Sequence, residues 1–196
     1  MSRVSRDVHL DTLDTLDILD TFDVMHFDPT LGPTILPPML RDRLLLGVWV
    51  GIVAAAATAG TLIGFGWTRG SPLHPLNTVA HIVIGSRAFY LREAHALVTP
   101  LAVIVHAASL AGWGALFSLA LGRFRAPVPV AAFVFTALVA IVDFALLPER
   151  FSPGFETVLT QTEVIVVYLV MAVAMTLAAG KLRVASSEQR GPRIFA

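Results

Sequence analysis

The chain has 196 residues, of which 56% are hydrophobic and only 14% are charged, and its mean hydropathy is +0.75. A soluble domain has about 45–50% apolar and about 25% charged residues, so this composition argues against a water-soluble protein. The absence of cysteine excludes disulfides, iron–sulfur clusters and thiolate zinc sites, and the formal net charge of zero gives no indication of nucleic-acid binding.

The first 30 residues carry seven aspartates against two arginines, in a triplet repeat that reads LDTLDTLDILDTFDV over residues 10–24. A spacing of three matches neither the helix period nor the strand period, so the aspartates form no regular face. We predict an acidic, disordered tail over residues 1–38. A calcium loop is disfavoured because the glycine and terminal glutamate of an EF-hand are missing.

Four long apolar runs follow, and they predict an all-α, integral membrane four-helix bundle over residues 39–183. The predicted spans cover about 44–67, 96–121, 127–147 and 162–180, and residues 184–196 are predicted to form a polar cytoplasmic tail. Small residues recur every fourth position in the first two spans, as at Gly47, Gly51 and Ala55, a spacing that favours close helix packing within the bundle.

The distribution of basic residues sets the expected orientation. Arginines and a lysine flank the spans on the side that holds both termini and the link between spans two and three: Arg41, Arg43, Arg123, Arg125, Lys181 and Arg183. We therefore expect both termini in the cytoplasm of a bacterium and the chain in its inner membrane.

The connection between the first two spans is predicted to contain a short amphipathic helix in the membrane interface or folded back on the bundle. Pro75 suits its first turn and Gly85 its end. The predicted apolar stripe consists of Leu76, Val79, Ile82 and Val83. Asn77 and His81 lie on the opposite side of that helix.

Two ionisable residues fall within spans, where such groups are rare and face the interior. His106 lies about 15 Å deep and Asp143 about 7 Å deep. Three interpretations stay open. In the first, His106 is a core histidine bonded to Ser109 or a backbone carbonyl. In the second, it is a ligand of a metal or haem. In the third, it forms a proton or ion path together with Asp143.

The ligand interpretation involves four histidines. His106 and His81 are its candidate cofactor ligands, and His74, His81 and His95 are its candidate ligands for a transition metal. Haem fits the same residue type, and the spacing of Ala102 and His106 matches that of antenna helices that hold bacteriochlorophyll. The preferred interpretation expects no cofactor.

Charged residues of the two outer loops are candidates for a structural clamp. Glu149 and Glu156 can form ion pairs with Arg87 or Arg92, Arg150 belongs to the same predicted clamp, and Asp143 can pair with Arg150 or Arg87.

Three motifs resemble a group of small, uncharacterised four-span membrane proteins of proteobacteria. They are HPLN followed by His81 and Gly85, then Val142–Phe144, then PERFSPGFE at residues 148–156. The resemblance implies the four-span fold over about residues 44–180 and implies no activity. Here Ile84 and Ala107 stand where the group often has an aromatic residue and a second histidine.

No nucleophile elbow, zinc-protease motif, phosphate loop or dinucleotide fingerprint is present. We therefore expect a non-catalytic scaffold or accessory subunit of a larger membrane complex, in contact with the lipid bilayer and with other membrane protein subunits. The alternatives are a histidine-ligated electron-transfer protein and an ion path.

Overall fold

The computed structural model describes residues 38–121 and 126–188. The predicted acidic tail, apart from Pro38, lies outside the described residues, as do Arg123, Arg125 and residues 189–196 of the predicted polar tail. All described residues belong to one compact unit.

Four long helices confirm the predicted fold class, and the described residues contain no strand. They are α1 (Pro38–Thr68), α4 (Val98–Leu121), α5 (Val128–Ile141) and α6 (Gln161–Glu188). A π-helical turn, η4 (Val142–Leu146), continues α5. Helices α1, α4 and α6 are each long enough and apolar enough to cross a membrane, and so is α5 together with η4. Because α6 extends to Glu188, residues 184–188 of the predicted polar tail are helical.

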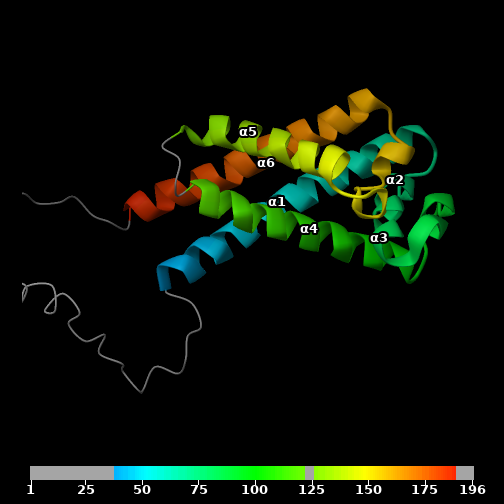
Figure 1. The fold of residues 1–196 in the computed structure, drawn as a ribbon, viewed down its shortest axis with the longest axis horizontal. Helices are drawn as coiled ribbons and strands as arrows, with labels where there is room; N and C mark the ends of the chain where they lie inside the picture. Colours follow the sequence, from blue (N-terminus) through cyan, green and yellow to red (C-terminus); the bar gives the residue numbers. More distant parts are fainter. Residues whose placement is uncertain (1–37, 122–125, 189–196) are drawn as a thin grey trace, which may run out of the picture. The chain divides into compact units, whose positions relative to one another are not determined.

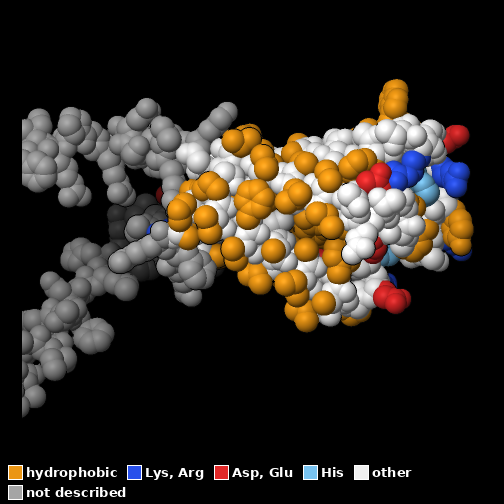
Figure 2. All heavy atoms as spheres, turned by 90° about the horizontal axis from the view of Figure 1, so that it is seen from above, with side chains coloured by type: hydrophobic (Ala, Val, Ile, Leu, Met, Phe, Trp, Pro, Cys, Tyr) orange, Lys and Arg blue, Asp and Glu red, His pale blue; other side chains and the backbone are white. Residues whose placement is uncertain are grey.

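The four helices run alongside one another (Figure 1). The start of α1 and the end of α6 lie at one end of the bundle, which we call the terminal end. The connections 69–97 and 147–160 lie at the other, which we call the loop end. Figure 2 shows hydrophobic side chains along the bundle and charged side chains gathered at the loop end. This distribution suits a bundle with its sides in lipid and its loop end in water.

Helix packing is uneven around the bundle. Helix α1 has its most extensive contacts with α4, followed by those with α6, and α5 packs mainly on α6, whereas α4 and α5 touch only slightly. Glycines bring α1 and α4 together, because a methyl group on Gly47 would meet the backbone of Gly114 and one on Gly51 would overlap that of Leu110. The predicted close-packing role of the small residues within the bundle is confirmed for this helix pair.

The connection between α1 and α4 contains the predicted short helix as successive α and 3-10 turns from His74 to Ile84, followed by a further 3-10 turn. It comprises α2 (His74–Asn77), η2 (Thr78–Ala80), α3 (His81–Ile84) and η3 (Gly85–Tyr90). Gly85 ends α3 with a φ of +72°, as predicted.

The predicted polarity of this segment was wrong. Asn77 and His81 are buried against the bundle, while Val83 is 55% exposed. Leu76 and Val79 are also buried, in a cluster with Leu62 and Phe155. The polar side chains turn inward because carbonyl groups of Thr78, Leu91 and Glu93 accept hydrogen bonds from them.

Candidate functional site: a polar cavity near the loop end

His106 on α4 is buried and bonded across the bundle to α1. Its Nε2 lies 2.9 Å from Thr58 Oγ1, and that hydroxyl donates to the carbonyl of Ala54 at 2.8 Å. With the hydroxyl hydrogen directed at Ala54, Nε2 of His106 is the donor, and Nδ1 keeps its lone pair as an acceptor. Thr58 is thus the side-chain partner of His106 in place of the expected Ser109, and the backbone of Ala55 also lies close enough to the imidazole to interact with it, in line with the expected backbone carbonyl.

Asp143 is buried in the π-helical turn η4 at the end of α5. The hydroxyl of Tyr168 on α6 donates to Asp143 Oδ2 at 2.6 Å. A π turn widens the helix locally and rotates the side chains that follow it, and such turns are frequent at functional sites. The expected ion pairs of Asp143 with Arg150 or Arg87 are not formed, because Asp143 turns toward α6 instead.

These two polar pairs line one cavity of about 130 Å³. Its polar lining comes from Thr58, His106, Ser109, Asp143 and Tyr168. The rest of the lining is apolar and includes the aromatic rings of Trp113, Phe151 and Phe155, which join the ring of Tyr168. The structure thus brings His106 and Asp143 to the same cavity, although neither is hydrogen-bonded to the other.

The cavity lies on the loop-end side of the aromatic contact between α4 and α5. Nearer the terminal end, Phe135 of α5 contacts Trp113 and Phe117 of α4, with ring centroids 6.2 Å and 5.3 Å apart. Closer to the loop end on the same helix, Ser109 is exposed although it lines the cavity. The space between the two helices therefore opens sideways beside Ser109.

The loop that follows η5 (Glu149–Phe151) closes the cavity at the loop end. Gly154 has a φ of +87°, and a methyl group there would lie 2.5 Å from His81 Nδ1. His81 Nδ1 donates to the carbonyl of Thr78 at 2.9 Å, and its ring stacks at 5.0 Å from that of Phe89. The His81 ring thus packs against Gly154 in the connection 147–160, and its Nδ1 is already bonded to a backbone carbonyl.

Asn77 joins three segments of the first connection. Its amide nitrogen donates to the carbonyls of Leu91 at 3.0 Å and Glu93 at 2.9 Å, and its oxygen accepts from Thr99 Oγ1 at 2.9 Å. The predicted structural residue therefore anchors the chain just before α4.

The remaining candidate metal ligands have separate backbone partners. His74 Nε2 donates to the carbonyl of Phe89 at 2.8 Å, and His95 Nδ1 accepts from the amides of Leu97 and Val98 at the start of α4. Among the described residues, no three His, Asp or Glu side chains are grouped closely enough to hold a metal ion.

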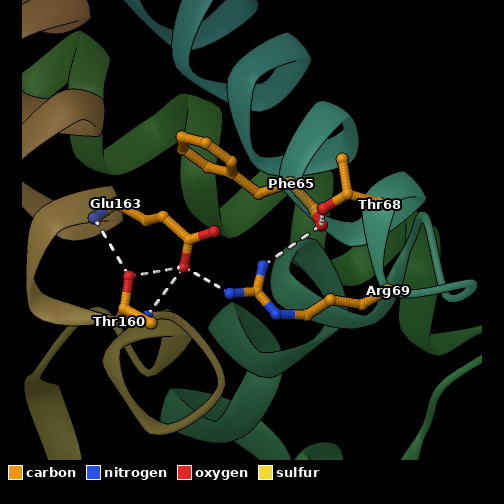
Figure 3. A network of polar contacts seen from close by, with 5 residues as sticks. All are labelled: Phe65, Thr68, Arg69, Thr160 and Glu163. Atoms are coloured by element: carbon orange, nitrogen blue, oxygen red, sulfur yellow. Dashed lines mark hydrogen bonds and ion pairs between the residues drawn. The ribbon is translucent and has the colours of Figure 1, made fainter.

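The ion pair of the loop end differs from the predicted clamp. Arg69 at the end of α1 pairs with Glu163 at the start of α6, and Arg69 also donates to the carbonyl of Phe65 (Figure 3). Arg87 and Arg150 are exposed, and in residues 38–121 and 126–188 neither forms an ion pair. The Ser152 hydroxyl lies within hydrogen-bonding distance of the backbone carbonyl of Glu149, at 3.0 Å, and of the Glu156 carboxylate, at 2.6 Å, and both groups are acceptors.

Glu163 also begins α6 through a capping box with Thr160 (Figure 3). Its carboxylate accepts from the amide and the hydroxyl of Thr160, both at 2.8 Å. The sequence signal for this cap, Thr-x-x-Glu before an apolar run, is present in the chain and was missed. Thr58 and Tyr168 were also missed, and no sequence signal distinguishes them from other span residues.

Fold and site together define a helical bundle with four candidate membrane spans and a polar cavity among them near its loop end. No family model, curated protein or solved structure matches the chain.

Proposed function

We propose that the chain is a multi-pass protein of a bacterial inner membrane, with both termini in the cytoplasm, that acts without catalysis as a scaffold or accessory subunit of a larger membrane complex. The loop end then faces the outer side. The lipid bilayer and other membrane protein subunits are its proposed partners.

The observation that carries this proposal is the exposure of α4 and α5. Only 22% of the apolar window of α4 and 17% of that of α5 is buried, against 50% for α6. On α5 the outward side chains are large and apolar, including Phe133, Val134 and Leu138. Of the four candidate spans, the one formed by α5 and η4 uses the smallest share of its window inside the bundle, so its apolar face is the proposed contact with a neighbouring subunit.

The interior supports a structural role over the alternatives. His106 is held through Nε2 by Thr58, and the predicted ligands His74, His81 and His95 are each engaged with backbone groups. An ion path through His106 and Asp143 would have to continue toward the terminal end, where the buried core is made of apolar residues such as Phe117, Val139 and Met175.

Site-specific photo-crosslinking in the native membrane tests the proposal. A photoreactive residue at Leu138 on α5 should give a protein adduct of one discrete mass, and the same residue at the exposed position Ile165 on α6 serves as the matched control. The adduct should disappear when Phe133 and Val134 are both replaced by serine. Lipid adducts alone at Leu138, together with a native mass equal to one chain, would contradict an accessory role.

A further inference from the structure

We propose that the cavity among α4, η4 and α6 is a binding site for a compact, lipophilic organic ammonium ion, which enters from the membrane beside Ser109. This inference requires the bundle alone and does not depend on a role in a larger complex.

The size of the cavity limits the ligand to a single ring or a group of similar volume. A buried apolar cavity of about 150 Å³ binds one benzene molecule, and this cavity measures about 130 Å³. The lining reaches from Phe155 at the loop end to Trp113 on α4. Trp113 lies two helical turns beyond His106, which corresponds to about 10 Å along the helix axis. An elongated molecule with one ring and a short polar arm fits these dimensions.

Apart from the Ser109 hydroxyl, which can donate and accept, the free polar atoms of the lining are acceptors. Asp143 accepts from Tyr168 through Oδ2, and Oδ1 has no protein partner among the described residues. His106 Nδ1 is likewise free to accept, because Nε2 is the atom bonded to Thr58. A ligand that complements this lining must therefore bring hydrogen-bond donors.

Electrostatics favours a donor that carries positive charge. The lining contains one carboxyl group and no lysine or arginine. Glu156 lies close enough to Asp143 and Tyr168 to act on both electrostatically, and its Oε2 is buried without a hydrogen-bond partner in the described part of the chain. A buried carboxylate that lacks a counter-ion is costly, and a bound cation removes that cost.

The aromatic lining completes a cation site. Rings of Trp, Tyr and Phe attract ammonium groups through their faces, and here Trp113, Phe151, Phe155 and Tyr168 surround a space that also holds Asp143. The rim is apolar: Phe151 is 50% exposed, and Leu147 is also exposed. A cation that reaches the cavity across such a rim must have an apolar body.

The test compares 2-phenylethylammonium with 2-phenylethanol, which has the same ring and a donor group but no charge. The full chain is placed in nanodiscs of uncharged lipid, with Trp49 and Trp67 replaced by phenylalanine so that Trp113 is the fluorescent reporter. Binding is followed by Trp113 fluorescence and by equilibrium dialysis. We expect saturable binding of the ammonium and at least tenfold weaker binding of the alcohol.

Asp143→Asn keeps an acceptor for Tyr168 and removes the charge, so ammonium binding should weaken at least tenfold. Glu149→Gln removes an exposed carboxylate of the loop end and should leave binding unchanged. Ser109→Phe blocks the opening from an exposed position and should abolish binding, which provides a second test if Asp143→Asn does not fold. Equal affinity for both probes, undiminished binding in either cavity variant, or no saturable binding by the parent would overturn the proposal.

Discussion

At the scale of single residues, several buried polar side chains are held by more than one hydrogen bond, whereas Thr136 Oγ1 and Glu156 Oε2 have no partner among the described residues. Asn77 is fully buried, and each of its three hydrogen bonds goes to a different residue. Such a group is a strong constraint, because a substitution that reverses donor and acceptor leaves several buried atoms unpaired.

We predict that Asn77→Asp lowers the free energy of unfolding by at least about 2 kcal/mol, because a carboxylate cannot donate to the carbonyls of Leu91 and Glu93. Thr99→Val removes one bond to the same side chain and should lower it by about 1 kcal/mol. Thermal or denaturant unfolding in detergent measures both. Equal stability of Asn77→Asp and the parent would show that the amide is hydrated rather than buried.

His106 separates the scaffold from the histidine-ligated alternative. We predict that His106→Gln keeps the fold, because an amide can donate to Thr58 Oγ1 as Nε2 does. The loss in stability should be near the average of about 0.6 kcal/mol for interhelical hydrogen bonds in membranes. Thr58→Val, which removes the same bond from the other side, is the matched control.

The measurement pairs unfolding with an optical spectrum and metal analysis of the purified protein. A visible absorption band or stoichiometric metal in the parent, lost in His106→Gln and retained in Thr58→Val, would establish the imidazole as a ligand and remove the support for a cofactor-free scaffold.

At the scale of elements, the bundle is held by one very close helix pair and several looser ones. Gly47, Gly51 and Gly114 place the backbones of α1 and α4 in contact, so no side chain larger than hydrogen fits at these positions. The α4–α5 pair has no comparable contact, and the cavity is lined by α4, η4 and α6 together with residues of α1 and the two loops.

We predict that Gly51→Ala lowers the free energy of unfolding by about 1–3 kcal/mol, because its methyl group would lie 2.7 Å from the Cα of Ala111 and overlap the carbonyl of Leu110. Gly112→Ala is the matched control on α4, since nothing lies within 4 Å of its added methyl group. It should leave stability unchanged or slightly raised. Equal effects of the two substitutions would indicate that α1 and α4 separate in solution.

The long helices could be predicted from the sequence, but most contacts between them could not. Apolar runs of sufficient length determine spans almost by themselves, and this is why α1, α4, α5 and α6 were expected. The partners of His106 and Asp143 were not predictable, because they depend on the rotation of each helix about its axis. The π turn at Asp143 changes that rotation, and the apolar sequence around it carries no signal for the change.

At the scale of the whole molecule, one polarity runs along the bundle. Charged side chains gather at the loop end, and the ion pair of Arg69 with Glu163 ties the first long helix to the last there (Figure 2). The proposed orientation of the bundle in a membrane rests on the basic residues beside the spans.

We predict that reporter fusions at Ala126 and at the C-terminus report cytoplasm, and that fusions at Ser71 and Ser152 report the outer side. Paired alkaline phosphatase and fluorescent-protein fusions measure this, because the first is active only outside and the second only inside. An outer signal at Ala126 would reverse the assignment of both ends.

The glycine contact between α1 and α4 has a consequence for the order of assembly. These are the first two long helices to be synthesised, and proteins that emerge from the ribosome acquire structure from the N-terminus onward. The closest helix pair therefore consists of the two long helices that leave the ribosome first. We expect α1 and α4 to associate before α6 is added to α1, so that the bundle is assembled from two helical hairpins.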